Sequence, residues 1–463
     1  MPVHALVLAA GKGTRMRSDT AKVLHRAAGR TLLDWVLDAV ALAEPDRTVV
    51  VVGHQAAAVA DSLGGDVETV LQEPQNGTGH AVQVALSHLG ALDADDTVLV
   101  TYGDMPLIPA EVYQDLAARP SEVAAILTTV DPGPAGFGRV KRDADGRVMR
   151  IVEERDCTPE ELGITERNAG LYAFAAGPLA EALSKLTADN VQGELYLTDV
   201  IEHLAASGGR ISVRRVAAGE VSGVNSHLDL AAVQAMLRER INSRLMEAGV
   251  WMLDPARVYV DATVEVEPGA RLYPGTHLEG ATTVAAGATI GPDTFVVDST
   301  VGPEATVMYS VLRGVTVGER ASVGPYASLR PGTVLEAGSK AGTFVEIKNS
   351  RVGEGAKVPH LSYMGDADIG AGANVGAGSI TCNYDGYRKN RTVIGEDAFI
   401  GSDTMLVAPV TVGDGAVTGA GSVITRDVEP GALAVERSEQ RQVPGYADRR
   451  AARHRAEEAD EGS

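Results

Sequence analysis

Aliphatic side chains recur at every sixth position through much of the second half of the chain, with glycines and small residues between them. The first run contains Val260, Val266, Leu272, Leu278, Val284, Ile290 and Val296. Two later runs contain Val317, Val323, Leu329, Leu335, Ala341 and Ile347, then Ile394, Ile400, Leu406 and Val412. A period of six is typical of a hexapeptide parallel β-helix, in which each step forms one short strand and one corner. The pattern predicts such a solenoid over residues 249–436.

The aliphatic period is interrupted most clearly at residues 381–391. Turn-forming, aromatic and basic residues, among them Asn383, Tyr384 and Arg391, replace the small and aliphatic ones. An insertion must leave the stacked coils as a loop. Long loops on rigid scaffolds often carry function, so we expect either a substrate or subunit contact here or a simple solvated excursion.

The first half of the chain, residues 1–226, has a different pattern. Short apolar runs typical of strands occupy residues 5–8, 49–52, 97–101 and 124–128, and helix-like stretches occupy residues 32–43 and 81–89. Such alternation predicts an α/β domain, Rossmann-like, with a mostly parallel sheet covered by helices. Ligands of these sheets bind beyond the carboxyl ends of the strands, which draws attention to the loops that follow these runs.

Two further segments complete the predicted organisation. Residues 227–248 form a helical connector whose apolar face contains Leu228, Ala231, Ala232, Ala235 and Leu237. Residues 437–463 are rich in arginine and glutamate and are predicted to be a solvated, partly disordered tail.

Composition narrows the functional classes. The chain of 463 residues is 44% hydrophobic, which supports large cores, and its net charge of −21 argues against a general nucleic-acid binder. Its two cysteines, Cys157 and Cys382, are far apart, so a disulfide framework is improbable and a reducing cytoplasm is the expected compartment. The apolar run at residues 3–10 is too short to span a membrane and lacks a cleavage site, so no membrane association is expected.

Two loops of the first half carry candidate chemistry. The first contains Gly11, Lys12, Gly13 and Arg15 after a strand, with Lys22 downstream, so that backbone N–H groups and cations could hold phosphates. It lacks the residue order of a P-loop or a dinucleotide fingerprint. The second places Asp104 at a strand end, either as a ligand for Mg²⁺ or as a helix cap.

These motifs resemble those of the sugar-nucleotide pyrophosphorylases, in the run from Leu8 to Met16 with Lys22. With the hexapeptide half, residues 3–440 resemble the bacterial family of bifunctional N-acetylglucosamine-1-phosphate uridylyltransferases and glucosamine-1-phosphate N-acetyltransferases. The resemblance implies acetyl transfer from acetyl-CoA to glucosamine-1-phosphate, then uridylyl transfer from UTP with release of pyrophosphate. The product would be UDP-N-acetylglucosamine, a precursor of peptidoglycan.

The resemblance also implies roles for residues of the first half. Arg15 and Lys22 would be catalytic, and Asp104 and Asn225 would hold Mg²⁺. The nucleotide and its sugar would be bound by Leu8, Ala9, Ala10, Gly11, Lys22, Gln72, Gly77, Thr78, Tyr102, Gly103, Asp104, Gly138, Glu153, Asn168 and Asn225. The chain departs from the family pattern at Ala21, where proline is usual, and at Ala169, within an Asn-Thr-Gly-like motif.

The hexapeptide half contains two histidines, His277 and His360, too few for the three imidazoles of a zinc carbonic anhydrase. His360 lies off the aliphatic period, and a neutral imidazole can accept the proton of an attacking amine. By resemblance, His360 is the catalytic base. The sugar phosphate would be bound by Arg330, Lys348, Tyr363 and Asn374, and acetyl-CoA by Ala377, Asn383, Tyr384, Ser402, Ala420 and Arg437.

The resemblance implies a homotrimer with acetyl-transfer sites shared between neighbouring copies. The alternative is a sugar-1-phosphate nucleotidyltransferase whose β-helix only oligomerises or regulates. His360, the loop at residues 381–391, and the pair Arg330 and Lys348 argue against a purely structural β-helix.

Overall fold

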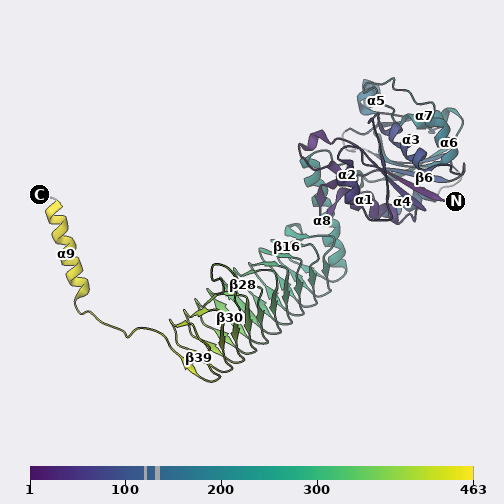
Figure 1. Ribbon diagram of the computed structural model, residues 1–463. Helices are drawn as coiled ribbons and strands as arrows, with labels where there is room; N and C mark the ends of the chain where they lie inside the picture. Colours follow the sequence, from purple (N-terminus) through teal and green to yellow (C-terminus); the bar gives the residue numbers. More distant parts are fainter. Residues whose placement is uncertain (119–121, 131–135, 462–463) are drawn as a thin grey trace. The chain divides into compact units, whose positions relative to one another are not determined.

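The computed structural model describes residues 1–118, 122–130 and 136–461 and contains two compact units (Figure 1). The first unit comprises Met1–Ala248 with Pro255–Val264, and the second comprises Gly249–Asp254 with Glu265–Ser463. This division differs from the expected boundary after residue 226, because the connector helix belongs to the first unit.

The first unit is built on a mostly parallel sheet, as predicted. The strand order is β11-β7-β10-β6-β1-β4-β5, with β8 and β9 attached to β10, and β10 is antiparallel to both its neighbours β6 and β7. The strands of this sheet are β1 (Val3–Leu8), β4 (Arg47–Val52), β5 (Glu68–Leu71), β6 (Thr97–Tyr102), β7 (Ala124–Val130), β8 (Arg139–Arg142), β9 (Val148–Val152), β10 (Glu166–Ala175) and β11 (Ile211–Val216). A small hairpin joins β2 (Arg26–Ala27) and β3 (Arg30–Thr31).

Helices cover both faces of this sheet (Figure 1). One apolar core packs α3 (Thr78–Leu89), α6 (Ala176–Leu183) and α7 (Asp199–Ala206) on one face. The other core packs α1 (Leu32–Ala41) and α4 (Ala110–Ala117), with a contribution from α2 (Ala56–Asp61). Because both faces are covered, β1, β4 and β6 are almost wholly apolar and buried, which explains why they could be found as continuous apolar runs. The remaining short elements are α5 (Pro159–Leu162), η1 (Thr14–Met16), η2 (Lys22–Leu24), η3 (Glu154–Asp156), η4 (Ala218–Glu220), η5 (Pro255–Arg257) and β13 (Val258–Val260).

The connector is α8 (His227–Glu247), which begins at Ser226, whose side chain accepts a hydrogen bond from the Asp229 N–H. Its buried apolar face contains Val233, Leu237, Ile241 and Leu245, one residue per turn. The predicted face was wrong except for Leu237, since Leu228 is 81% exposed and Ala231, Ala232 and Ala235 are also exposed. Alanines on the solvent side favour the helix without marking its packed face.

The second unit is a left-handed parallel β-helix of three stacked sheets (Figure 1). Leu272 pairs with Ile290, Val266 with Val284 and Leu278 with Val296, so three hexads close one coil. Most of the predicted aliphatic positions are fully buried, for example Ile290, Leu335 and Ile400 at 0% exposure. The six-residue period is therefore confirmed as the core of the solenoid.

The three sheets take every third strand. The first contains β12 (Trp251–Met252), β15 (Arg271–Leu272), β18 (Thr289–Ile290), β21 (Thr306–Val307), β24 (Ser322–Val323), β27 (Lys340–Thr343), β30 (Lys357–His360), β33 (Asn374–Val375), β36 (Phe399–Ile400), β39 (Val417–Thr418) and β41 (Leu433–Ala434). The second contains β16 (Thr276–Glu279), β19 (Thr294–Val297), β22 (Val311–Arg313), β25 (Ser328–Leu329), β28 (Glu346–Lys348), β31 (Tyr363–Gly365), β34 (Ile380–Cys382), β37 (Met405–Val407) and β40 (Val423–Ile424). The third contains β14 (Glu265–Val266), β17 (Thr283–Val284), β20 (Thr300–Val301), β23 (Val315–Val317), β26 (Thr333–Leu335), β29 (Arg351–Val352), β32 (Ala367–Ile369), β35 (Thr392–Ile394) and β38 (Val410–Val412).

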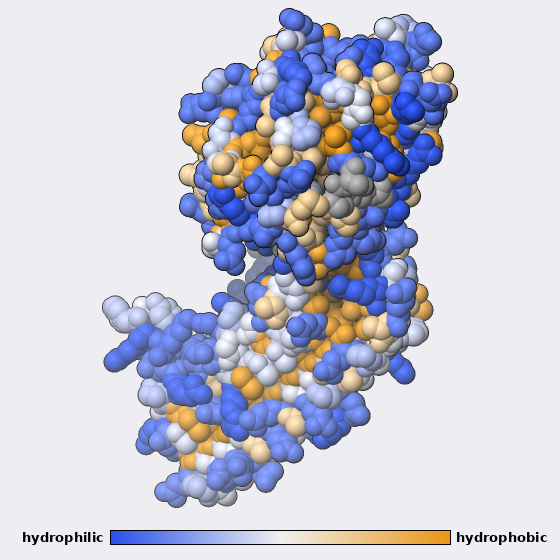
Figure 2. All heavy atoms as spheres, turned by 90° about the vertical axis from the view of Figure 1, so that its right-hand side faces the viewer, coloured by the Kyte–Doolittle hydropathy of each residue, from blue (hydrophilic) through white to orange (hydrophobic). Residues whose placement is uncertain are grey.

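One corner of the β-helix carries exposed aromatic side chains, here called the aromatic ladder: Tyr309, Tyr326 and Phe344. The ring centroids of Tyr309 and Tyr326 are 5.6 Å apart and those of Tyr326 and Phe344 are 5.3 Å apart. Leu361 continues the corner with 63% of its surface exposed. Figure 2 shows that hydrophobic residues are exposed in patches between hydrophilic ones on the face that it draws.

Beyond the last coil, the tail contains α9 (Tyr446–Glu461), a helix that the sequence analysis missed. Ion pairs between residues four apart, Arg453 with Glu457 and His454 with Glu458, favour this helix, and its described side chains are exposed. Within the described part of the chain, every helix is too short or too polar to cross a membrane.

Two candidate active sites

The loops that follow β1, β5 and β6 surround a cavity of about 1030 Å³ at the carboxyl ends of these strands. Most of the residues predicted for nucleotide binding line it: Leu8, Ala9, Ala10, Gly11, Arg15, Lys22, Gln72, Gly77, Thr78, Tyr102, Asp104 and Asn225. Gly103 follows Tyr102 directly, and its N–H donates to the Leu8 carbonyl. The predicted position of the site agrees with the rule that parallel sheets bind ligands at this edge.

The loop after β1, which contains Gly11, Gly13 and Arg15, depends on close contact between Gly13 and Lys22. Gly13 has a φ of 57°, in the left-handed region, and a Cβ on this residue would lie only 2.8 Å from the Cβ of Lys22. A side chain would therefore push Lys22 away. Glycine here allows the loop to fold tightly around the lysine.

Lys22, Asp104 and Asn225 come together from three distant segments. The Lys22 Nζ contacts the Asp104 carboxylate and lies 3.3 Å from the Asn225 Oδ1. Asp104 follows β6, and Asn225 is held just before α8 by a 3.0 Å hydrogen bond from its N–H to Asp229. A carboxylate and an amide oxygen that converge on one positive charge are also suitable ligands for a divalent cation. These residues fit a metal whose other ligands come from substrate and water.

The side chains of Gln72 and Thr78, which also line the cavity, are held by hydrogen bonds with backbone groups. The Gln72 Nε2 donates to the Gly77 carbonyl at 2.9 Å, and the Leu197 N–H donates to the Thr78 hydroxyl at 3.0 Å. Gln72, directly after β5, is thus fixed against Gly77, and Thr78 is fixed at the start of α3, where base-selecting contacts were expected.

The predicted sugar-binding residues Gly138, Glu153 and Asn168 are not among the side chains that line this cavity. The Asn168 N–H donates to the Gly138 carbonyl at 2.9 Å, which joins β10 to β8. Glu153 accepts a 3.0 Å hydrogen bond from the Thr198 hydroxyl, and burial raises the pKa of its carboxyl.

Several lining residues were missed by the sequence analysis: His54, Gln75, Arg155, Gln192 and Glu194. Arg155 donates to Gln192 at 2.7 Å, which closes one side of the cavity. Gln75 belongs to the same motif as Gln72 and could have been proposed from its position. The other four sit among ordinary polar surface residues, and only the tertiary fold brings them to the cavity.

In the β-helix, strand register aligns His360 with three predicted acetyl-CoA positions. Lys357, Asn374, Phe399 and Val417 pair in successive coils. Three residues after each lies a position at the end of the strand or in the corner that follows it, and these are His360, Ala377, Ser402 and Ala420, here called the corner column. Backbone bonds link the successive corners, such as Asp403 N–H to Ala377 carbonyl at 2.7 Å and Gly421 N–H to Ser402 carbonyl at 2.8 Å.

The corner column is open in the single chain. His360, Ser402 and Ala420 are exposed, and Ala377 is half-buried. The exposed guanidinium of Arg437 donates to the Ala420 carbonyl at 3.0 Å, at the end of the column. An extended ligand could therefore lie along these corners and end near the imidazole of His360.

Basic side chains gather at the other end of the second sheet's strands, where Arg330 follows β25 and Lys348 ends β28. Arg330 pairs with Glu346 at 2.9 Å, and Lys348 lies near both Arg330 and Lys389. The adjacent ammonium of Lys389 lowers the pKa of Lys348, chiefly through direct contact. Lys389, from the loop between β34 and β35, was not predicted. Two neighbouring cations are suited to an anion such as a phosphate.

Asp366 connects this basic group to the acetyl-CoA residues. Its carboxylate is 8% exposed and accepts hydrogen bonds of 2.6 Å from both Asn349 and Asn383. These two bonds help to lower its pKa, as do the charges of Lys348 and Lys389, although burial acts in the opposite direction and is the largest single effect. Tyr363 and Asn374 are half-buried on β31 and β33, while Tyr384 is 62% exposed on the loop.

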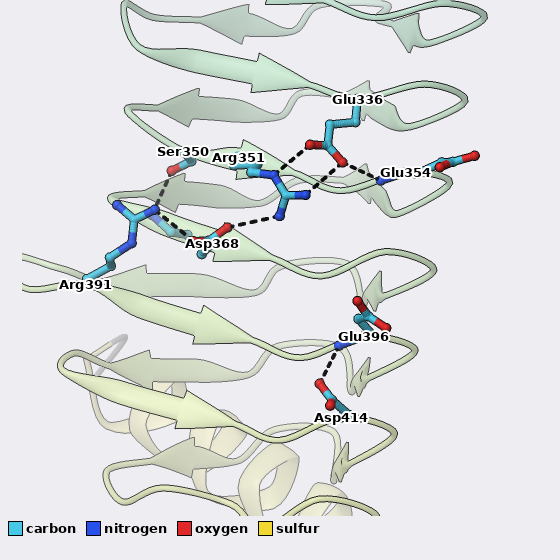
Figure 3. A network of polar contacts seen from close by, with 9 residues as sticks. Glu336, Ser350, Arg351, Glu354, Asp368, Arg391, Glu396 and Asp414 are labelled. Carbon is cyan, nitrogen blue, oxygen red and sulfur yellow. Dashed lines mark hydrogen bonds and ion pairs between the residues drawn. The ribbon is translucent and has the colours of Figure 1, made fainter.

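The end of this loop is anchored by a network of ion pairs (Figure 3). Arg391 contacts Asp368 at 3.2 Å, and Asp368 contacts Arg351 at 3.5 Å. Arg351 in turn makes a two-point contact with Glu336, at 2.7 and 2.9 Å. The loop predicted from the break in the hexad pattern is thus tied to two neighbouring coils.

Comparisons with known proteins match both units. Residues 5–215 match the MobA-like NTP transferase domain, and residues 391–426 match the bacterial transferase hexapeptide repeats. A protein of Mycolicibacterium vanbaalenii named bifunctional protein GlmU is 49% identical over 456 residues, which cover 96% of this chain and 92% of the relative. Proteins of the same name from Streptomyces coelicolor and Mycobacterium tuberculosis are 47% and 46% identical, over 97% and 96% of this chain and 95% and 92% of the relatives.

These relatives align with both units, so the rival prediction of a β-helix that serves only oligomerisation or regulation is not supported. Within the described residues, no cluster of three or more histidine, cysteine, aspartate or glutamate side chains could hold a metal. The chain belongs to the bifunctional GlmU family, whose members are uridylyltransferases and glucosamine-1-phosphate acetyltransferases of UDP-N-acetylglucosamine synthesis.

Proposed function

We propose that the first unit transfers a uridylyl group from UTP to N-acetylglucosamine-1-phosphate with Mg²⁺. The observation that supports this proposal best is the convergence of Lys22, Asp104 and Asn225 beside a large cavity at the strand ends. A phosphate oxygen of the sugar phosphate attacks the α-phosphorus of UTP, and pyrophosphate leaves.

In this reaction the protein positions the reactants and neutralises charge. Arg15 and Lys22 offset the negative charge of the triphosphate. They also offset the charge that develops on the pyrophosphate as it leaves. Asp104 and Asn225 would hold Mg²⁺, which supplies further neutralisation of the phosphates when bound. Gln72, Gly77 and Thr78 contact the uracil, and Gly138, Glu153 and Asn168 hold the sugar.

The second unit transfers an acetyl group from acetyl-CoA to the amine of glucosamine-1-phosphate. The amine nitrogen attacks the thioester carbonyl, the imidazole of His360 takes the amine proton, and coenzyme A leaves as its thiolate. Arg330 and Lys348 bind the sugar phosphate, with Lys389 beside them, and Tyr363 and Asn374 orient the sugar. Acetyl-CoA lies along the corner column with contacts to Ala377, Asn383, Tyr384, Ser402, Ala420 and Arg437.

Acetyl transfer comes first and supplies the substrate for uridylyl transfer. The working form is a homotrimer, supported by the exposed aromatic ladder and by a corner column that is open in the single chain. The cytoplasm is the compartment, in line with two free cysteines and with its supply of UTP and acetyl-CoA.

Paired variants test the assignment of the two sites. Replacing His360 by Ala should slow acetyl transfer by about 10²–10⁴-fold and leave uridylyl transfer unchanged. His277→Ala is the matched control, since it removes the other histidine of the β-helix, and it should affect neither reaction. Asp104→Ala should impair uridylyl transfer alone, with partial recovery at high Mg²⁺. Equal loss of both reactions in either variant would refute the assignment.

A further inference from the structure

In the first unit, a row of polar side chains in contact with one another runs from the cavity wall to Asn168. The Asn168 Nδ2 donates to the Tyr172 hydroxyl at 2.6 Å. The Tyr172 hydroxyl contacts that of Tyr102, and Tyr102 is also hydrogen-bonded to Thr78. Tyr172 is 0% exposed, while Tyr102 and Thr78 line the cavity. Tyr172 therefore joins Tyr102 of the cavity wall to Asn168, a predicted sugar-binding residue that is not among the residues lining the cavity.

The direction of these hydrogen bonds can be worked out from the donors available. The Tyr172 oxygen accepts from Asn168, so its single proton is free to be donated to Tyr102. The Thr78 hydroxyl accepts from the Leu197 N–H and donates its proton to Tyr102 as well. The Tyr102 oxygen thus receives two hydrogen bonds, and its own proton remains for an acceptor in the cavity.

Burial keeps the Tyr172 phenol protonated. It is the largest cause that raises the pKa of this phenol, and the nearby charge of Glu153 acts in the same direction. The Tyr172 hydroxyl therefore keeps the proton that it donates to Tyr102.

The local fold is shaped around this chain of contacts. The pairing of β10 with β7 shifts register between Asn168 and Tyr172, which marks an irregularity in the strand. Within it, Gly170 has a φ of 73°, and a Cβ there would lie 2.8 Å from the ring of Tyr102. Any other residue would displace the Tyr102 ring. The irregular strand thus allows Asn168, Tyr172 and Tyr102 to meet.

We propose that Tyr172 is a positioning residue for the sugar phosphate of uridylyl transfer. It presents Tyr102 as a hydrogen-bond donor and holds the Asn168 amide in place. The inference rests on the proposed function, in which Asn168 holds the sugar, and on the position of Tyr102 in the wall of the cavity. Tyr172 itself touches neither substrate, and its role is exerted through these two neighbours.

The test is Tyr172→Phe, which removes one oxygen atom and keeps the ring. Tyr113→Phe is the matched control, because Tyr113 is also fully buried and its hydroxyl contacts Thr101 at 3.1 Å, away from the cavity lining. In Tyr172→Phe we expect the KM for N-acetylglucosamine-1-phosphate to rise about tenfold, as for loss of one oriented hydrogen bond. The KM for UTP and the rate of acetyl transfer should stay within about twofold of wild type.

A double mutant separates positioning from a general loss of stability. On an Asn168→Ala background, Tyr172→Phe should raise the KM for the sugar phosphate by much less than tenfold, because one of its two partners is already gone. Thermal unfolding of the two tyrosine variants should shift by similar amounts.

Three results distinguish the possible failures. Absence of uridylyl transfer in the wild-type protein would overturn the proposed function itself. An active wild type with the same KM values in Tyr172→Phe and Tyr113→Phe would overturn only the positioning role. Equal increases in the KM for UTP and for the sugar phosphate would also contradict it, since they would indicate a general distortion of the cavity.

Discussion

At the scale of single residues, charged side chains in each unit are arranged around a place suited to an anionic substrate. In the first unit, Lys22 is held between Asp104 and Asn225 at the edge of the cavity. In the second, Lys348 and Lys389 repel each other, and this lowers the pKa of Lys348. An anion bound between them would relieve that repulsion, so a substrate phosphate placed there would stabilise an arrangement that is unfavourable without it.

We expect Glu153 to make uridylyl transfer sensitive to acid. Burial is the main cause that raises its pKa above the ordinary value of 4.5, so the carboxylate takes up a proton at a higher pH than an exposed glutamate does. A protonated carboxyl is a poorer acceptor for a sugar hydroxyl. We therefore expect the KM for the sugar phosphate to rise as pH falls from neutrality towards that raised pKa.

The matched comparison is Glu153→Gln, which cannot titrate. Its KM should be higher than that of wild type at neutral pH but should lack the part of the pH dependence due to residue 153. Steady-state KM values measured for both proteins across the same pH series check this. Parallel pH profiles for the two proteins would show that Glu153 is not responsible.

At the scale of elements, strand pairing sets the register of the predicted acetyl-transfer residues, which lie at strand ends and in the corners of the β-helix. The column that contains His360 follows directly from strand pairing between successive coils. The loop between β34 and β35 adds Asn383 and Lys389 and is anchored at two points, at Asp366 from the inside and at Asp368 on the surface.

These two anchors should differ in importance. Asp366→Asn would remove one of the two carboxylate oxygens that accept from Asn349 and Asn383, and a buried Asn383 amide without its acceptor costs about 1–3 kcal/mol of stability. We expect the KM for acetyl-CoA to rise by about tenfold, because Asn383 loses its orientation. Asp368→Asn is the control two residues away, in β32, and its half-exposed ion pairs should contribute about 0–1 kcal/mol.

Acetyl-transfer kinetics and thermal unfolding of both variants provide the measurement. Uridylyl transfer should be unchanged in each. If Asp368→Asn impaired acetyl transfer as much as Asp366→Asn, the surface network of Figure 3 would be the main anchor of the loop.

Elements with a strict sequence period could be predicted well, and contacts between segments could not. Positions such as Leu272 and Ile290 showed the solenoid because every coil repeats the same buried side chain. Lys389 and Asp366 gave no signal, since their significance arises only when the loop folds back on the neighbouring coils. The packed face of α8 was missed because exposed alanines resemble an apolar stripe in sequence.

The chemistry of the first unit shows the same limit. Gly13 and Lys22 could be recognised as a loop motif, but the meeting of Asp104 with Asn225 depends on the fold and had been expected from family resemblance alone. Tyr172 lies among apolar residues in a buried strand, and nothing in the sequence distinguishes its hydroxyl from that of Tyr113.

At the scale of the whole molecule, the two units serve different transfer reactions. Association of several copies of the chain would involve both units. The aromatic ladder exposes Tyr326 and Phe344 at 55% and 58%, which is unfavourable in water. We expect sedimentation to give a mass about three times that of the 48.1 kDa chain.

Replacing Tyr326 and Phe344 together by Ser should weaken this association and slow acetyl transfer more than uridylyl transfer. Val191→Ser is the control, since it removes a 73% exposed apolar side chain from a loop of the first unit. A ladder variant that keeps the wild-type mass would show that other faces hold the copies together.

The central claim is that one chain carries out two successive transfers, and an omission experiment tests it most directly. The protein is incubated with glucosamine-1-phosphate, acetyl-CoA, UTP and Mg²⁺, each is then left out in turn, and the products are separated and weighed by mass spectrometry. UDP-N-acetylglucosamine should form only in the complete mixture, and omission of UTP should leave N-acetylglucosamine-1-phosphate. Formation of UDP-glucosamine at an undiminished rate without acetyl-CoA, or no acetylated sugar at all, would contradict the account.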